Sequence, residues 1–195
     1  MKNDMKKMLA DTLWVAHTLF DCQLVTGSTG NISFMYDHKI YISRSGSCFG
    51  RLTQDDFAVL DQNGKLLSNQ KPSKEYPLHV MLYQKKGYQA VIHTHSFYAT
   101  LWSCQHDLPV TDIMPDYTPY LRMKVGSIGL IPYEKPGSQA LFEAFAQRLD
   151  ASDGYLLAHH GPVLGGKDMM DAFSKLTELE ESAHIAWALR AREIS

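Results

Sequence analysis

Two histidines, His93 and His95, lie two residues apart in the apolar segment AVIHTHSF, residues 90–97. In an extended strand alternate side chains point to the same face, and the chain rises about 3.3 Å per residue. The two imidazole rings would therefore leave the backbone roughly 6 to 7 Å apart, close enough to bind one metal ion. This spacing predicts a metal site at the end of a strand, to which other segments must add ligands.

A second pair of histidines, His159 and His160, is expected to end a buried strand just before the Gly-Pro turn of LLAHHGPV. Adjacent strand residues face opposite ways, so we expect only one of the two to bind metal. Three imidazoles would leave an open position on Zn²⁺, which is typical of a catalytic zinc site. The other histidines, His79 among them, are interpreted as polar filler or pH-sensitive groups without a role in the chemistry.

Glu75 is the candidate for a movable fourth ligand. It lies beside small polar residues at the predicted N-terminus of a helix. The alternative interpretation is that its charge only favours the positive end of the helix dipole.

Three separate segments are rich in small polar residues: GSTGNIS, SRSG and PSKE. Such loops offer hydroxyls, backbone N–H groups and a lysine, which together can hold a phosphate group. Serine and glycine are common in all loops, so each segment alone is weak evidence. Their combination with a metal site predicts a sugar phosphate as substrate.

Composition places the chain among ordinary globular proteins. Its 195 residues are 45% hydrophobic and carry a formal net charge of -2, which does not favour binding to nucleic acid or an anionic membrane. We expect a single domain, residues 1–195, with a small-molecule partner. Three cysteines without a CxxC pair, and a first segment unlike a signal peptide or membrane span, predict a cytoplasmic location.

Hydrophobic periodicity and turn residues predict alternating helices and strands. An Asn63-Gly64 turn of type I′ is expected in a hairpin, and Ser73 and Ser138 are expected to cap helices. This pattern indicates one α/β domain with several antiparallel hairpins. The expected helices are 1–20, 73–86, 97–105, 139–149 and 168–193, the expected strands lie within 38–46, 57–68, 90–95, 127–133 and 154–166, and residues 25–36 are expected to form a loop.

The blocks GSTGNIS, SRSG, KPSKE, AVIHTHS and AHHGPVLGG, in that order, resemble the class II aldolase and adducin family along nearly the whole chain. The segments RSGSCFGRL, KPSKE, TPYLRMKVG, IPYEKPGS and ELEESAH are most similar to its 3-oxo-tetronate 4-phosphate decarboxylase branch. The resemblance implies a three-layer α/β/α sandwich with a largely antiparallel central sheet. It also implies a homotetramer with active sites at the subunit interfaces.

The same resemblance implies a role for each matching residue. A divalent metal ion, expected to be Zn²⁺ and one per subunit, with Mn²⁺ and Co²⁺ as alternatives, would be bound by His93, His95 and His160. Glu75 would be both a resting metal ligand and the catalytic acid/base. Tyr120, or alternatively Tyr117, would assist from a neighbouring subunit. Substrate phosphate would be bound by Gly30, Asn31, Ser45, Gly46, Ser73 and Lys74.

The implied reaction is decarboxylation of a 3-oxo-tetronate 4-phosphate to dihydroxyacetone phosphate and CO2 through a metal-bound enediolate. Lys74 adds a cation that suits a doubly anionic substrate. The first alternative is an aldolase of the fuculose or ribulose phosphate type, which cleaves a ketose phosphate to dihydroxyacetone phosphate and an aldehyde. The second is an adducin-like binding module that has lost its metal. The resemblance implies no evident counterpart, among these residues, of a further C-terminal tyrosine found in some aldolases.

Overall fold

The computed structural model describes residues 2–105 and 108–193, and in this part of the chain seven strands form one sheet. The strand order is β3-β2-β1-β4-β7-β6-β5, and every neighbouring pair is antiparallel except β5 and β6. A parallel pair needs a crossover connection, which is supplied here by a helix between β5 and β6. The strands are β1 Asn31–Tyr36, β2 Lys39–Ser43, β3 Phe57–Asp61, β4 Ala90–His93, β5 Ile128–Ile131, β6 Gly154–Leu157 and β7 Gly161–Gly166.

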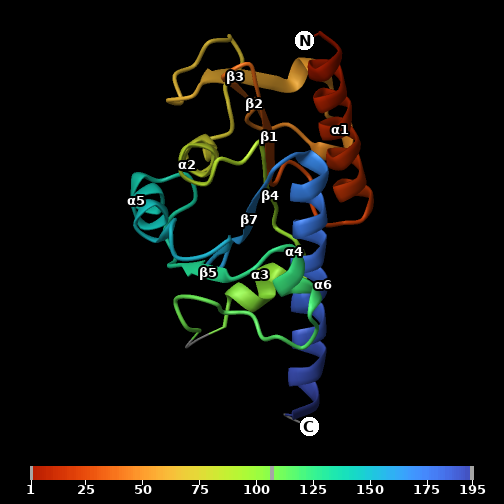
Figure 1. Ribbon diagram of the computed structural model, residues 1–195, viewed down its shortest axis with the longest axis vertical. Helices are drawn as coiled ribbons and strands as arrows, with labels where there is room; N and C mark the ends of the chain where they lie inside the picture. The colour runs from red at the N-terminus through yellow and green to blue at the C-terminus, as the bar shows by residue number, and fades with distance from the viewer. Residues whose placement is uncertain (1, 106–107, 194–195) are drawn as a thin grey trace.

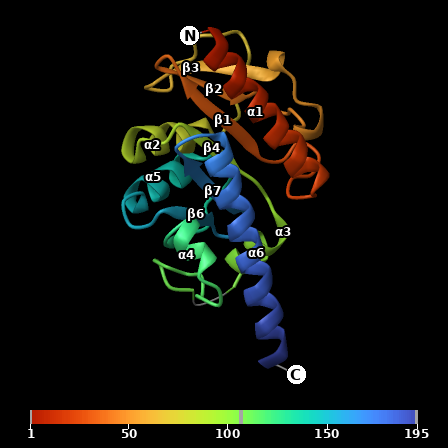
Figure 2. The ribbon, with the colours of Figure 1, turned by 45° about the vertical axis from the view of Figure 1, so that its right-hand side comes forward.

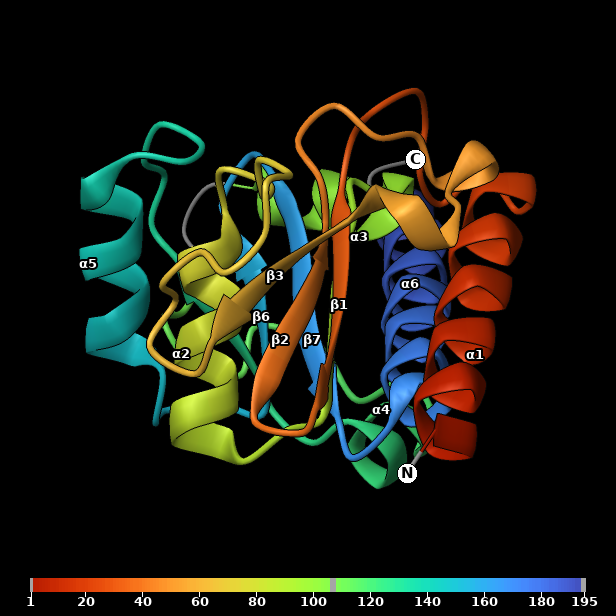
Figure 3. The same cartoon turned by 90° about the horizontal axis from the view of Figure 1, so that it is seen from above.

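Helices cover both faces of this sheet, as Figure 3 shows: α2 and α5 lie on one side, and α1 and α6 on the other. The short helices α3 and α4 contact α6. The predicted three-layer α/β/α sandwich with a largely antiparallel sheet is confirmed, and the one parallel pair makes the sheet mixed. The helices are α1 Lys2–Asp21, α2 Tyr76–Lys86, α3 Phe97–Ser103, α4 Tyr120–Lys124, α5 Gln139–Arg148 and α6 Met169–Glu193, with 3₁₀ turns at Phe49–Arg51 and Gln54–Asp56.

The long helix α6 extends beyond the sheet, so its C-terminal part projects from the body of the molecule (Figures 1 and 2). No helix within residues 2–105 and 108–193 has the length and apolar character needed to cross a membrane.

The two faces of the sheet bury different side chains. In β1, Ile32 and Phe34 join the hydrophobic cluster on the α1 and α6 side. Because side chains alternate along a strand, Asn31 and Ser33 point to the other side, toward α2. The pleat of β1 thus directs polar groups to the face on which the site described below is built.

Several local predictions are wrong. Residues 31–36, expected in a loop, form β1, and α2 begins at Tyr76, with Glu75 at its N-cap position in place of Ser73. The type I′ turn is also misplaced. Gly64 has a φ of +83°, but Asn63 does not have a positive φ, whereas Asp37 and His38 between β1 and β2 have the required left-handed pair at +49° and +58°.

Candidate active site

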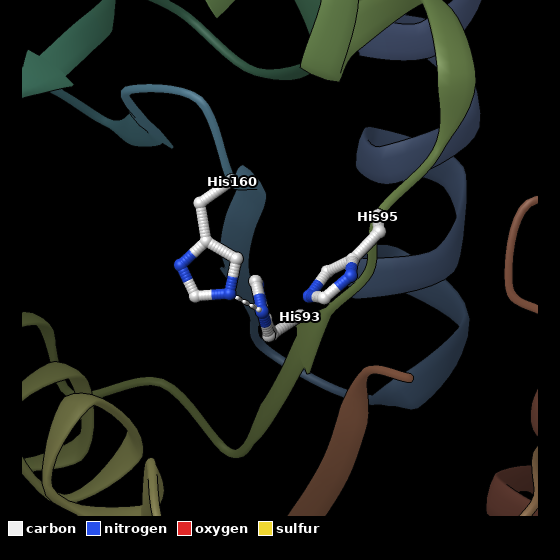
Figure 4. Close-up of side chains that lie close together, drawn as sticks. All are labelled: His93, His95 and His160. Atoms are coloured by element: carbon white, nitrogen blue, oxygen red, sulfur yellow. Dashed lines mark hydrogen bonds between the residues drawn. The ribbon is translucent and has the colours of Figure 1, made fainter. Parts of the chain in front are cut away.

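Three histidines converge at one edge of the sheet, where β4 and β6 end and β1 and β7 begin (Figure 4). His93 is the last residue of β4, His95 follows it, and His160 lies in the turn between β6 and β7. One ring nitrogen from each lies within 4.8 Å of the others. The structure therefore brings together the two histidine segments that the sequence analysis singled out.

His95 is not held by the strand pleat, because β4 ends at His93. Its neighbours fix it from both sides. Thr94 N donates to the Pro162 carbonyl at 3.2 Å, and α3 begins two residues after His95. The start of α3 is in turn held by the buried Glu180 carboxylate of α6, which accepts hydrogen bonds from two backbone N–H groups of α3.

Glycines permit the close approach of the segments that carry the histidines. Gly30 has a φ of +76°, and a Cβ there would lie 2.8 Å from the His93 carbonyl oxygen. Gly161, with a φ of +146°, follows His160, and a Cβ there would overlap the Thr94 carbonyl oxygen. A larger residue at either position would push the site apart, because both contacts are to backbone atoms.

Glu75 lies beside this cluster. Its Oε2 is 3.4 Å from His93 Nε2, and its Oε1 is 3.5 Å from His160 Nε2. The residue is 4% exposed, and its side chain makes no capping hydrogen bond to α2. It therefore faces the histidines and does not cap the helix on which it is placed.

The donor set of these four residues fits a divalent cation. His93 Nδ1 lies 2.9 Å from the Pro162 carbonyl and donates to it, so the lone pair of Nε2 faces the cluster. Glu75 Oε1 is buried without a hydrogen-bond partner in the described part of the chain, as is His160 Nδ1. A buried carboxylate oxygen without a hydrogen-bond partner is costly unless a cation compensates its charge.

The electrostatics keep the histidines in the form that binds metal. Burial, with a smaller contribution from His95, lowers the pKa of His93 to about 3. Burial, together with His93, also lowers the pKa of His160 to about 3, and burial lowers the pKa of His95. All three rings are therefore neutral near pH 7, with lone pairs available to a metal ion.

A cavity of about 540 Å³ opens beside Glu75, His95 and His160. It contains every residue predicted to bind phosphate, from three separate segments. Those residues are Gly30, Asn31, Ser45, Gly46, Ser73 and Lys74.

The sequence analysis missed other residues of this cavity. Arg44 is the most important, because it adds a second cation to the cavity lining, where its Nε lies 2.6 Å from Asp56 Oδ1. Arg44 lies within the SRSG segment, so its position in that loop was the available signal. The remaining missed residues of the cavity are Ser28, Thr29, Ser47, Thr100 and Pro136, and its lining also includes His159, the alternative to His160 in the sequence analysis.

Tyr120 does not reach this cavity. It lies at the start of α4, its side chain is 55% exposed, and it is absent from the residues that line the cavity within the described chain. Tyr117 is 50% exposed and is likewise outside the described lining. Neither tyrosine therefore lines this cavity within the described chain.

Comparison with known proteins places the chain in a family. The model described as Class II Aldolase and Adducin N-terminal domain matches residues 10–187. This chain belongs to the class II aldolase and adducin family. Class II aldolases depend on a divalent metal, in agreement with the histidine cluster, and the family assignment makes this chain a lyase.

The names of two curated relatives of this class II aldolase family member describe reactions of phosphorylated compounds. A 3-oxo-tetronate 4-phosphate decarboxylase from Haemophilus influenzae is 35% identical over 92% of this chain and 87% of its own length. An L-fuculose phosphate aldolase from Methanocaldococcus jannaschii is 36% identical over 88% of this chain and 91% of its own. The solved structure of YgbL from Klebsiella pneumoniae has a TM-score of 0.90 and 32% identity, covering 94% of this chain and 90% of that chain.

Proposed function

We propose that this lyase decarboxylates a 3-oxo-tetronate 4-phosphate to dihydroxyacetone phosphate and CO2. The observation that carries the proposal is the presence of two cations, Arg44 and Lys74, in the cavity that also contains Glu75 and two of the clustered histidines. A substrate with both a phosphate and a carboxylate group suits a cavity lined by two cationic side chains, because charge-assisted hydrogen bonds to such anions are strong. The similarity to decarboxylases over most of the chain supports the same reaction.

The phosphate group would be held by the three loops that line the cavity. Backbone N–H groups and hydroxyls of these loops would bind its oxygens, with a cation to balance its charge. The residues proposed for this role are Gly30, Asn31, Ser45, Gly46, Ser73 and Lys74. Binding energy gained at this remote group can orient the carboxylate that leaves.

The metal would be held by His93, His95 and His160, with Glu75 as a further ligand before substrate binds. We propose Zn²⁺, one ion per subunit, because three imidazoles suit this ion. A bound divalent ion supplies Lewis-acid stabilisation of negative charge that develops on substrate oxygens.

Glu75 would handle the proton. The bond to the carboxylate carbon breaks, CO2 leaves, and the electron pair stays on the substrate. Glu75, after taking up a proton from solvent in the cavity, would deliver it to the carbon that lost the carboxylate and return to its carboxylate form. Its buried position beside the cavity, with one oxygen free of hydrogen bonds in the described structure, supports this role.

A second candidate is cleavage of a ketose phosphate to dihydroxyacetone phosphate and an aldehyde. The similarity to L-fuculose phosphate aldolases over 88% of the chain favours it. Both reactions leave an electron pair on the same kind of substrate carbon, so one site could serve either. The products distinguish them, because only the first releases CO2.

We also propose that residues 1–195 work as one domain in a cytoplasmic homotetramer, without nucleic-acid or membrane partners. Active sites at the subunit interfaces would let Tyr120 of one subunit assist its neighbour. The exposed position of Tyr120 supports this arrangement. The side chains of Met123 on the same helix and of Phe97, two residues after His95, are also exposed.

The decisive experiment incubates the Zn²⁺-loaded protein with 3-oxo-tetronate 4-phosphate and measures CO2 and dihydroxyacetone phosphate. We expect metal-dependent release of both products, lost in Glu75→Gln. Glu143→Gln is the matched control, since Glu143 lies on α5 outside this cavity and hydrogen bonds to Gln139. Release of an aldehyde from a ketose phosphate, without any CO2 from the tetronate, would favour the aldolase instead.

A further inference from the structure

A chain of buried polar side chains runs from Glu75 into the layer between α2 and β1. Asn31 Nδ2 donates to Glu75 Oε2 at 3.2 Å, and Asn31 Oδ1 lies 2.5 Å from His79 Nε2. Ser33 Oγ lies 2.6 Å from His79 Nδ1 and 2.6 Å from the Tyr83 hydroxyl. All five side chains are buried.

The spacing of these residues matches the geometry of the two elements. Glu75, His79 and Tyr83 recur every four residues and therefore share one face of α2 and its N-cap. Asn31 and Ser33 alternate along β1 and share the face toward that helix. Two local periodicities thus align five polar groups in one row.

Each hydrogen bond in this row can run in only one direction. The Glu75 carboxylate accepts, so the Asn31 amide turns its Nδ2 toward it and its Oδ1 toward His79. His79 Nε2 must then carry the hydrogen, because a bare nitrogen would face the Asn31 oxygen with two lone pairs. The orientation of the Asn31 amide therefore determines the tautomer of the His79 imidazole.

The rest of the row follows from the neutral state of the ring. Burial, with a smaller contribution from His93, lowers the pKa of His79 to about 3, so Nδ1 is bare and accepts the hydrogen of the Ser33 hydroxyl. Ser33 has then used its hydrogen, and Tyr83 must donate to it. Every donor in the row points toward Glu75.

We propose that His79, in its Nε2–H form, is a positioning residue that locks the Asn31 amide and thereby holds the Glu75 carboxylate by one oxygen. Oε2 is tied to Asn31, while Oε1 is left without a hydrogen-bond partner among the described residues. His79 contacts neither the cavity nor the three clustered histidines through a hydrogen bond in this structure. The inference rests on the proposed function only for the catalytic role of Glu75.

The interpretation of His79 as a residue without a role in the site is revised accordingly. Its signal in the sequence was the i, i+4 spacing from Glu75 on a predicted helix. The spacing alone does not identify the hydrogen-bond partner of His79, because Asn31 lies 48 residues earlier in the chain.

The first test needs no substrate. In protein labelled with ¹⁵N-histidine, nitrogen chemical shifts distinguish a protonated ring nitrogen from a bare one. We expect His79 to show a protonated Nε2 and a bare Nδ1. The opposite tautomer, or a mixture of the two, would overturn the proposal.

The second test compares two amide substitutions of similar polarity. In His79→Gln, the amide nitrogen can reach the former position of Nε2 and still donate to Asn31. In His79→Asn, the shorter side chain reaches only the former position of Nδ1. We expect His79→Asn to lose about 10- to 100-fold in kcat with a smaller change in KM, and His79→Gln to keep most of kcat.

The control is His17→Asn, which removes another helical histidine, one whose Nε2 lies 2.9 Å from the Leu52 carbonyl outside the cavity. It is expected to keep kcat. Equal losses in His79→Gln and His79→Asn would indicate a general packing effect and overturn the proposal, as would full kcat in both. The affinity for Zn²⁺, measured by competition with a chelator, should fall in the same order.

Failure of the proposed decarboxylation can be distinguished from failure of the positioning role of His79. In the first case the wild-type protein would release no CO2 from the tetronate. The His79 tautomer and the order of Zn²⁺ affinities would still test the positioning role.

Discussion

The carboxylate of Glu180 on α6 accepts two hydrogen bonds from the backbone of α3. Tyr98 N, 82 residues earlier in the chain, donates to Oε1 at 2.7 Å, and Ala99 N donates to Oε2 at 2.9 Å. Ser96, at the N-cap position of α3, makes no side-chain capping hydrogen bond, so Glu180 supplies this function from another helix. Since α3 follows His95 directly, Glu180 fixes the segment that carries a proposed metal ligand.

We therefore expect Glu180→Gln to weaken Zn²⁺ binding by roughly 10-fold, because an amide accepts less strongly than a carboxylate and cannot accept with both ends. Competition with a chelator measures this affinity. Glu181→Gln is the matched control, because the neighbouring Glu181 side chain is largely exposed. Unchanged affinity in Glu180→Gln would show that His95 is positioned without this cap.

Lys74 offers a test of how the cavity recognises anions. A charged hydrogen bond to substrate is worth about 1.5–3 kcal/mol, so Lys74→Met should lower kcat/KM for the tetronate phosphate by about 10- to 100-fold. Lys71→Met, which changes an exposed lysine outside the cavity lining of the described residues, should have little effect. Steady-state kinetics of the two variants check the prediction, and equal kinetics would remove Lys74 from the substrate site.

The buried histidines predict a loss of stability in acid. His79 has a pKa near 3 in the folded protein, against an ordinary value of 6.5 that applies to the unfolded chain. The unfolded state therefore binds a proton that the folded state does not, and the free energy of unfolding falls as pH decreases from 6.5 toward 3. One such group contributes a slope of about 1.4 kcal/mol per pH unit within this window.

Urea unfolding of the metal-free protein at a series of pH values measures this slope. His93 and His160 add to it, because their pKa values are also near 3. In His79→Gln the free energy of unfolding should change less steeply with pH, because about one proton fewer is taken up on unfolding. A slope equal to that of the wild-type protein would show that His79 does not contribute.

Metal removal should lower the unfolding temperature. A ligand present at 100 times its dissociation constant stabilises the folded state by about 2.7 kcal/mol. A chelator should therefore shift the unfolding midpoint of the Zn²⁺-loaded wild type downward, while His160→Ala, which removes a proposed ligand, should show a much smaller shift. His17→Ala should respond as the wild type does. An equal shift in His160→Ala would exclude His160 from the ligand set.

The sequence alone determined those features that depend on near neighbours in the chain. His93 and His95 are two residues apart, so local spacing predicted that they lie together, whereas the choice of His160 over His159 came from the resemblance to class II aldolases. Helix periodicity predicted α1, α5 and α6, and Ser138 caps α5 as expected. The loops proposed to bind phosphate were found because serine, glycine and lysine fall in short, separate blocks.

Only the tertiary structure decided the long-range pairings. Strand β1 was missed because its polar face, Asn31 and Ser33, resembles a loop until α2 covers it, and strand propensity depends on such context. In the same way, Glu180 meets α3 only after α6 has packed against it. Hydrogen bonds between groups 44 to 82 residues apart leave no periodic pattern in the sequence, because packing of whole elements brings their ends together.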